Sequence, residues 1–263
     1  MTPQAHAAAS GLQKIPGFEN TAYAFSEGRV VWVGGSVSGH MHPVTRHPRD
    51  LQAPWQPAAR RFDAAKLRRG AKACRQLFDT SNRQRLQAKG LMLWLTGQTM
   101  AFPLNHATAR FDAIQSALQD QDARGFETAA ARVLGLGHGL TPSGDDFVGG
   151  IFFALSHLPV GTLGEAWQRE LPGVASRIRN AAATATNAIS AALLGDMLQG
   201  ASYSALHELL VAFETEDAIK IEAACAHVMR LGATSGSDML AGVLLALAIQ
   251  PPAIDAGGSQ KSP

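Results

Sequence analysis

Residues 135–147, GLGHGLTPSGDDF, carry the pattern that decides the fold, because residues 232–247, GATSGSDMLAGVLLAL, repeat their plan. With Pro142 left out, the aligned pairs are Thr141 and Thr234, Ser143 and Ser235, Gly144 and Gly236, Asp146 and Asp238, Gly150 and Gly242, and Ala154 and Ala246. In both segments a polar loop leads into an apolar run, and a Thr or Ser is placed to cap the helix that begins there. The chain is therefore predicted to build one loop-helix unit twice.

The glycines inside the two predicted helices indicate how these helices pack. Gly150 and Gly242 fall one to two turns after the helix starts, where glycine costs about 1 kcal/mol relative to alanine. Close crossing of the two helices explains this choice, because a missing side chain lets backbones approach. We expect the crossing to bring both loops to one cleft.

The loops have the composition of an anion site. Clustered glycines let backbone approach a ligand, and the free N–H groups of a helix start attract phosphate or carboxylate. Acidic side chains oppose an anion unless they accept local hydrogen bonds or share a divalent cation with it. The predicted substrate-binding residues are Gly137, His138, Gly139, Thr141, Ser143, Gly144, Thr186, Asn187, Thr234, Ser235, Gly236 and Ser237. The predicted catalytic residues are Asp145, Asp146 and Asp238, which are also the metal ligands if Mg²⁺ is used.

Simpler interpretations exist for several of these residues. Ser143, Asp145 and Asp238 fit ordinary helix caps, and the glycines fit tight packing. His138 fits either a phosphate donor and acid-base group or an exposed residue at a loop tip. Residues 174–198 are predicted to form one long helix, on which Thr186 and Asn187 either face the cleft or bond back to the helix itself.

Residues 135–147 resemble the hallmark of a bacterial family related to the smallest subunit of the three-part oxamate carbamoyltransferase, long catalogued as a domain of unknown function. The resemblance is densest over residues 132–155 and continues through 184–194 and 233–247; the family usually has proline at the position of His138. It implies a component of an enzyme that moves a carbamoyl group between carbamoyl phosphate and oxamate, or a similar small acid, in purine (allantoin) catabolism. It also implies two larger partner subunits.

Two other functions are compatible with the same residues. One is a Mg²⁺-dependent hydrolase of a small phosphorylated or amide substrate, in which the three aspartates hold the ion. The other is a non-catalytic assembly subunit of a multi-subunit enzyme. No cofactor besides Mg²⁺ is suggested.

Composition narrows the function classes further. A formal net charge of +2 over 263 residues gives no reason to expect nucleic acid as a partner. No segment reaches the roughly 18 to 20 apolar residues that a membrane span needs. Cys74 and Cys225 are far apart and lie in alanine-rich helical contexts, so we interpret them as small core residues without a disulfide. The sequence predicts a soluble cytoplasmic protein without a membrane partner.

The predicted fold class is α+β, with a β-rich N-terminal domain packed on a mainly helical one. Residues 1–104 form the first domain, with strand-like patterns over 29–33 and 90–102 and one helix over 64–78. Residues 105–250 form the helical domain, and residues 251–263 are expected to be a disordered tail. His40 and His42 follow a glycine-serine loop, which favours a solvent-exposed segment over a metal site.

Overall fold

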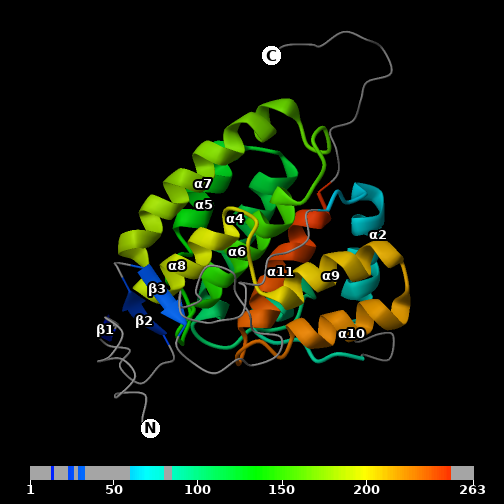
Figure 1. Ribbon diagram of the computed structural model, residues 1–263, viewed down its shortest axis with the longest axis horizontal. Coiled ribbons are helices and arrows are strands. Elements are labelled where there is room, and N and C mark those ends of the chain that lie inside the picture. The colour runs from blue at the N-terminus through cyan, green and yellow to red at the C-terminus, as the bar shows by residue number, and fades with distance from the viewer. Residues whose placement is uncertain (1–12, 15–22, 27–28, 33–59, 80–84, 250–263) are drawn as a thin grey trace.

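The computed structural model describes residues 13–14, 23–26, 29–32, 60–79 and 85–249 (Figure 1). Three short strands, β1 (Gln13–Lys14), β2 (Tyr23–Ser26) and β3 (Arg29–Trp32), form an antiparallel sheet in the order β1-β2-β3. The helices are α2 (Ala64–Gln76), α3 (Leu91–Leu95), the 3₁₀ helix η1 (Leu104–Ala107), α4 (Thr108–Gln119), α5 (Ala123–Ala131), α6 (Ser143–Ser156), α7 (Glu165–Ala185), α8 (Ala188–Met197), α9 (Ser204–Thr215), α10 (Ala218–Val228) and α11 (Ser235–Leu247).

The described part of the chain is mainly helical, so the predicted α+β class with a β-rich N-terminal domain is wrong. Residues 60–104 contain α2 and α3, η1 begins at Leu104, and the predicted strand over 90–102 includes α3 instead. The run Leu91–Leu95 contains no β-branched residue, and a short apolar run of this kind does not separate strand from helix by periodicity. The predicted strand over 29–33 coincides with β3, which lies beside α8.

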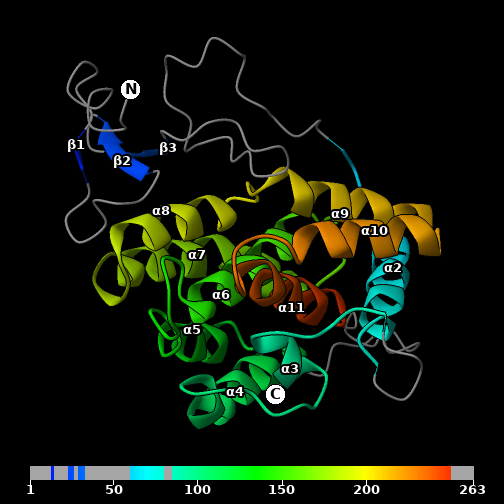
Figure 2. The same cartoon turned by 90° about the horizontal axis from the view of Figure 1, so that it is seen from below.

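Helices α6 and α11 lie side by side at the centre of the molecule (Figures 1 and 2). Every residue of α6 from Ser143 to Leu155 is buried, and so is every residue of α11 from Gly236 to Leu247. A helix that is buried all round has to be enclosed by other elements. The repeat seen in the sequence therefore forms the central helix pair.

The backbones of the central pair touch at its two glycines, which confirms the predicted crossing. A Cβ atom at Gly150 would overlap the carbonyl oxygen of Met239, and one at Gly242 would overlap that of Phe147. Phe147 and Met239 are themselves aligned in the repeat, so the contact is reciprocal. Any larger residue at either glycine has to force the helices apart.

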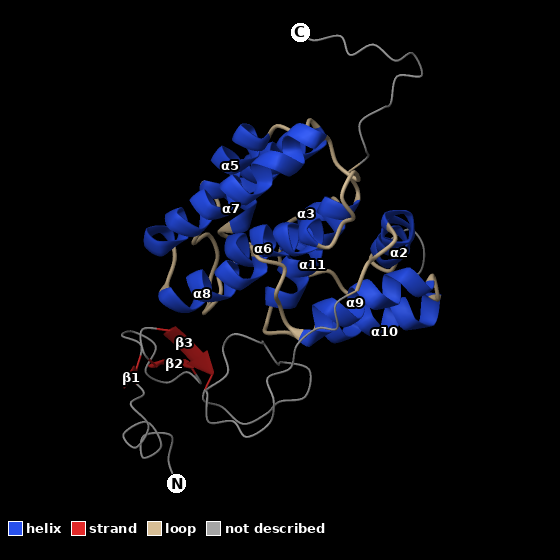
Figure 3. Cartoon of the chain, turned by 45° about the horizontal axis from the view of Figure 1, so that its top comes forward, coloured by secondary structure: helices blue, strands red, loops and turns tan. Residues whose placement is uncertain are grey.

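The other helices cover the central pair. Helices α2 and α3 pack on α11, α8 packs on α6, α5 packs against both α4 and α7, and α9 packs against both α2 and α10. Figure 3 shows α2, α9 and α10 grouped on one side of the pair, with α5, α7 and α8 on the other. Leu67 of α2 and Phe213 of α9 belong to the same buried cluster as Phe147 of α6. One core thus runs through the described helices.

Cys74 of α2 and Cys225 of α10 form a disulfide, so the prediction that they are core residues is confirmed and the prediction that they form no disulfide is wrong. Both side chains are fully buried where α2 and α10 pack together. A separation of 151 residues gave no indication that they are neighbours.

Several sequence predictions fall outside the described residues. They include His40, His42 and the tail over 251–263. Within the described ranges, no helix combines the length and the apolar character needed to cross a membrane.

We predict that Gly242→Ala lowers the free energy of unfolding by at least about 1–3 kcal/mol, because the new methyl group overlaps the carbonyl oxygen of Phe147. The matched control is Gly195→Ala in α8, where the nearest atom to an added Cβ is the Nε of Arg179 at 3.8 Å. The control should be neutral or slightly stabilising, since alanine favours helix. Urea denaturation of both variants checks this; equal stability of the two would contradict the packing argument.

Candidate functional site

The two loops meet at the N-terminal ends of α6 and α11. The hydroxyl oxygens of Thr141 and Ser235, one from each copy of the repeat, lie 2.7 Å apart, and either can be the donor. Both side chains are partly exposed, as is Thr234, whereas Ser143 is buried. Hydroxyl groups from both loops therefore share one patch of surface.

Two carboxyl groups lie buried at this junction, at aligned positions of the repeat. Asp146 is 5% exposed and Asp238 is not exposed at all. Asp146 receives hydrogen bonds from Thr141 of its own loop and Ser235 of the other. Asp238 correspondingly receives hydrogen bonds from Thr234 of its own loop and Ser143 of the other. Each acid thus ties the two loops together.

Burial changes the acidity of both groups. Desolvation raises the pKa of Asp146 well above its usual range, the charge of Asp238 adds to this, and the two hydroxyl groups oppose it. Desolvation also raises the pKa of Asp238 to about 6, against the backbone N–H of Leu91 and two hydroxyl groups. The negative charge of Asp238 disfavours ionisation of Asp146, so a double negative charge at this junction is costly. Asp238 is therefore able to exchange a proton near pH 6.

Asp145 has a different environment from its neighbour Asp146. Its Oδ1 accepts the backbone N–H of Gly135 at 2.8 Å, and its Oδ2 accepts the hydroxyls of Thr186 at 2.5 Å and Ser190 at 2.7 Å. These bonds join the beginning of the first loop to the start of α8. The carboxylate is saturated by local donors, which is one of the two ways expected for an acid beside an anion site.

Asn187 holds the middle of the first loop. Its Nδ2 donates to the carbonyl of Leu140 at 2.9 Å, and its Oδ1 caps α8 by accepting the N–H groups of Ile189 and Ser190. The single helix predicted over 174–198 is therefore wrong, since α7 ends at Ala185 and a new helix begins after Asn187. The break places Asn187 at the loop, whereas Thr184 bonds back to its own helix.

The predicted caps of the central helices are wrong. The N-cap positions are Pro142 for α6 and Thr234 for α11, and neither makes a side-chain capping bond. Pro142 has no hydroxyl group, and the hydroxyl of Thr234 bonds Asp238 instead. Ser143 and Ser235, one position later, bond the acids of the opposite helix. Tertiary contacts thus take the hydroxyl groups that local capping would use.

Most of the loop glycines serve packing. A Cβ at Gly144 would overlap the carbonyl oxygen of Val133, and one at Gly236 would overlap that of Val228. Gly137 and Gly139 have φ values of 120° and 106°, which favour glycine. Only Gly139, of the glycines in the two predicted binding loops, has open space where a side chain would stand. Backbone approach to a ligand is therefore available at Gly139 rather than at Gly144.

His138 lies on the exposed side of the first loop. Its ring centroid is 6.3 Å from that of Phe102, whose side chain is 70% exposed and also contacts His106. The sequence gave no signal for this aromatic neighbour. His138 stands at the rim of the site rather than with the buried acids.

A segment that the sequence analysis did not connect to the site supports its base. The N–H of Leu91 donates to Asp238 Oδ1 at 2.6 Å, and the hydroxyl of Ser237 donates to the carbonyl of Lys89 at 2.7 Å. Ser237, predicted to bind substrate, is therefore used within the protein. Ser190, like Leu91 and Lys89, was not predicted as a site residue. Its only signal in the sequence was its position near Thr186 and Asn187.

The described residues contain no group of three or more His, Cys, Asp or Glu side chains arranged to hold a metal ion. Both carboxyl oxygens of Asp145 already accept hydrogen bonds, from Gly135, Thr186 and Ser190. We therefore assign no metal ligand in this region.

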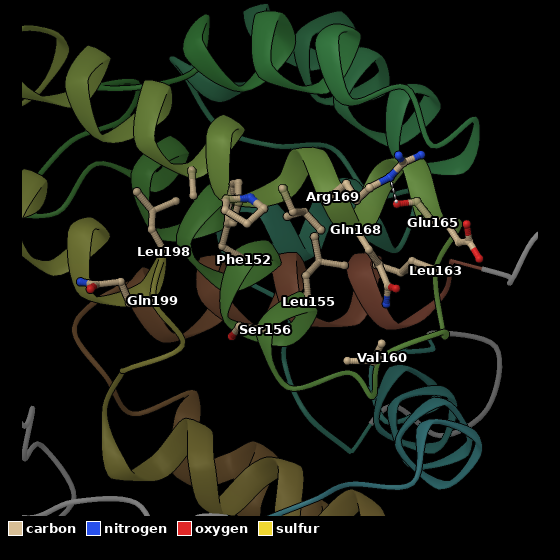
Figure 4. A pocket seen from close by; sticks show the side chains of 13 residues that line it. Phe152, Leu155, Ser156, Val160, Leu163, Glu165, Gln168, Arg169, Leu198 and Gln199 are labelled. Carbon is tan, nitrogen blue, oxygen red and sulfur yellow. Dashed lines mark hydrogen bonds between the residues drawn. The ribbon is translucent and has the colours of Figure 1, made fainter.

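A surface cavity of about 760 Å³ lies near the other end of α6 (Figure 4). Its lining is mainly apolar and includes Phe152 and Leu155 of α6, with Leu163, Arg169 and Leu198 from neighbouring segments. None of the predicted site residues lines it. The chemistry carried by the repeat is therefore at the opposite end of the central helix.

Comparison with known proteins finds one family model that is similar to the repeat region. Residues 133–247 match the family model described as oxamate carbamoyltransferase subunit AllH. The match covers both loops and both central helices, and confirms the resemblance expected from the sequence. No curated protein and no solved structure matches the chain.

We predict that Asp238→Asn flattens the pH dependence of stability. The folded-state pKa of Asp238 is about 6, above the ordinary value of 3.8, so the folded state binds the proton more tightly than the unfolded state. The free energy of unfolding should therefore fall as pH rises from about 4 to about 6, by up to about 3 kcal/mol from this group.

The asparagine variant should lose that part of the decline, as measured by urea denaturation across this pH range. An unchanged pH profile in Asp238→Asn would show that the carboxyl group does not carry the effect.

Proposed function

We propose that this chain, whose residues 133–247 match the family model of the oxamate carbamoyltransferase subunit AllH, binds a small anionic substrate of that reaction where its two loops meet. The observation that carries the proposal is the 2.7 Å contact between the hydroxyls of Thr141 and Ser235, which joins the two copies of the repeat. These partly exposed hydroxyls, with Thr234 and the open backbone at Gly139, supply donors at one surface.

The substrates of the family reaction suit such donors. Carbamoyl phosphate carries a phosphate, and oxamate carries a carboxylate beside an amide. Hydroxyl groups bind such anions by donating hydrogen bonds, and the starts of α6 and α11 add the favourable end of two helix dipoles. Donors fixed in advance in this way stabilise charge without a covalent nucleophile.

The buried acids support these donors. Asp146 and Asp238 lie beneath the hydroxyl groups that they bond, and Asp145 holds the first loop against α8. We assign Asp146 and Asp238 to positioning of Thr141, Ser235 and their counterparts rather than to direct contact with the substrate. Asp145 and Asn187 fix the shape of the loop.

The family description names a subunit, which indicates a multi-subunit complex. We propose that two larger subunits accompany this chain and that the reaction takes place in the complex, in purine (allantoin) catabolism. The Mg²⁺-dependent hydrolase has no comparable support, because the described acids form no metal-binding group.

A non-catalytic assembly subunit is the second candidate. The observation in its favour is that Gly144 and Gly236 pack against backbone carbonyls, so these glycines are explained without a ligand. Under this alternative, the loops hold the central helices together and bind nothing.

We predict that the full-length chain binds oxamate or carbamoyl phosphate and that Thr141→Val weakens this binding at least about tenfold. A hydrogen bond to a charged group contributes about 1.5–3 kcal/mol, and valine keeps the shape while removing the hydroxyl. Isothermal titration calorimetry with each ligand, with and without Mg²⁺, measures the effect.

Thr184→Val is the matched control, since this hydroxyl is exposed and bonds only the carbonyl of Ala181 among the described residues. It should bind as the unmodified chain does. Equal affinity of Thr141→Val and Thr184→Val would place the ligand elsewhere, and no binding of either ligand by the unmodified chain would favour the assembly subunit.

A further inference from the structure

The two acids at aligned positions of the repeat each have one oxygen atom without a donor among the described residues. Asp146 and Asp238 are almost completely buried, and the Oδ2 atom of each accepts no hydrogen bond from the part of the chain that the structure describes. A buried carboxylate oxygen without a donor is costly, and native proteins rarely leave one so. A proton is the smallest partner that removes the cost, because it turns one carboxylate into a neutral donor.

We propose that Asp146 and Asp238 hold one proton between them when an anion occupies the loops, and that this proton turns the hydroxyls of Thr141 and Ser235 outward toward the anion. The inference rests on the proposed function, because it takes an anion at the loops as the ligand. It adds that binding of the anion and uptake of a proton are one coupled event.

The limited number of protons on a hydroxyl group links the charge of the acids to binding of the anion. Each hydroxyl has one proton to donate and two lone pairs. A charged Asp146 accepts that proton from Thr141 or Ser235, which leaves lone pairs toward the surface, where they repel an anion. A neutral carboxyl group no longer needs the proton. The Thr141–Ser235 contact can run in either direction, so the pair can turn a donor outward.

Among the residues that the structure describes, no positively charged side chain acts on Asp146 or Asp238. On α6, the other charged group acting on Asp146 is Asp145, which is also negative. From α8 come Thr186 and Ser190, which are neutral and bonded to Asp145. The first residue of α3, Leu91, presents its backbone N–H to Asp238, while Lys89 in the segment before α3 is exposed. His138 is exposed at the rim of the first loop.

Protonation of Asp146 and Asp238 determines how the affinity for the anion changes with pH. The pKa of Asp238 is raised to about 6 and that of Asp146 is raised well above 3.8 in the ligand-free chain. If the anion binds only the protonated pair, its affinity falls as pH rises, with a limit of about tenfold per pH unit for one linked proton. At pH values above the pKa of the acids, one proton passes from solvent to Asp146 and Asp238 for each anion bound.

Isothermal titration calorimetry of the full-length chain with oxamate and with sulfate tests this, because neither anion changes its own charge near neutral pH. Titrations at about pH 6, 7 and 8, each in two buffers with different ionisation enthalpies, give the number of protons taken up per anion. We expect this number to rise toward one at about pH 8, with affinity falling toward the tenfold limit. In Asp146→Asn and in Asp238→Asn no proton should be taken up with the anion, and the affinity that each variant has should no longer depend on pH, since an asparagine amide donates at every pH.

Two controls identify the source of the proton. Asp196 of α8 is also a buried acid, with a pKa raised to about 7, but it is absent from the interactions of the loop acids. Asp196→Asn and His138→Gln should therefore both keep the proton uptake. Loss of uptake in either control, or binding by the unmodified chain without uptake, would overturn the inference and leave the proposed function standing. Absence of anion binding at every pH would overturn the proposed function and the inference with it.

Discussion

The close contact between α6 and α11 is the constraint on which the rest of the structure depends. Gly150 and Gly242 let each backbone reach the opposite helix, although each glycine costs about 1 kcal/mol of helix stability. Since the contact is reciprocal, the two helix starts come together at one end of the pair. The loops that precede these helices therefore lie next to each other. The hydroxyl contact between Thr141 and Ser235 follows from this packing.

The same packing explains why two acids are buried at that end. The central helices are enclosed along almost their whole length, so polar groups in their first turns are removed from water. Asp146 and Asp238 offset part of the desolvation cost by bonding the hydroxyls of both loops. Each acid therefore makes the position of one loop depend on the other, and any ligand that changes its charge acts on both loops together.

The two copies of the repeat differ where they contact different neighbours. Asp145 in the first copy aligns with Ser237 in the second. Asp145 accepts three donors and connects the first loop to α8, whereas Ser237 donates to Lys89 in the segment before α3. The first loop is also longer, with Gly137, His138 and Gly139 extending it outward. The hydroxyl and acid residues that are the same in both copies thus lie together at the centre. Asp145 and Ser237, which differ between the copies, connect this centre to the surrounding segments.

The sequence revealed the features that local patterns encode. The repeat, the central helix starts and the glycine crossing could all be predicted, because spacing and residue type within short segments define them. The strand expected over 90–102 was wrong because Leu91–Leu95 is apolar without a helical or a strand period. The break after Ala185, the missing caps and the Cys74–Cys225 bond depend on contacts between distant segments. The hydrogen bond from the Leu91 N–H to Asp238 also joins distant segments, so this part of the candidate site could not be predicted from the sequence.

A crystal structure of the full-length chain with oxamate tests the central claim, that the two loops form one anion site. The account predicts the carboxylate of oxamate within about 3 Å of the hydroxyl oxygens of both Thr141 and Ser235. Oxamate bound to one loop alone, or in the apolar cavity at the other end of α6, would contradict it.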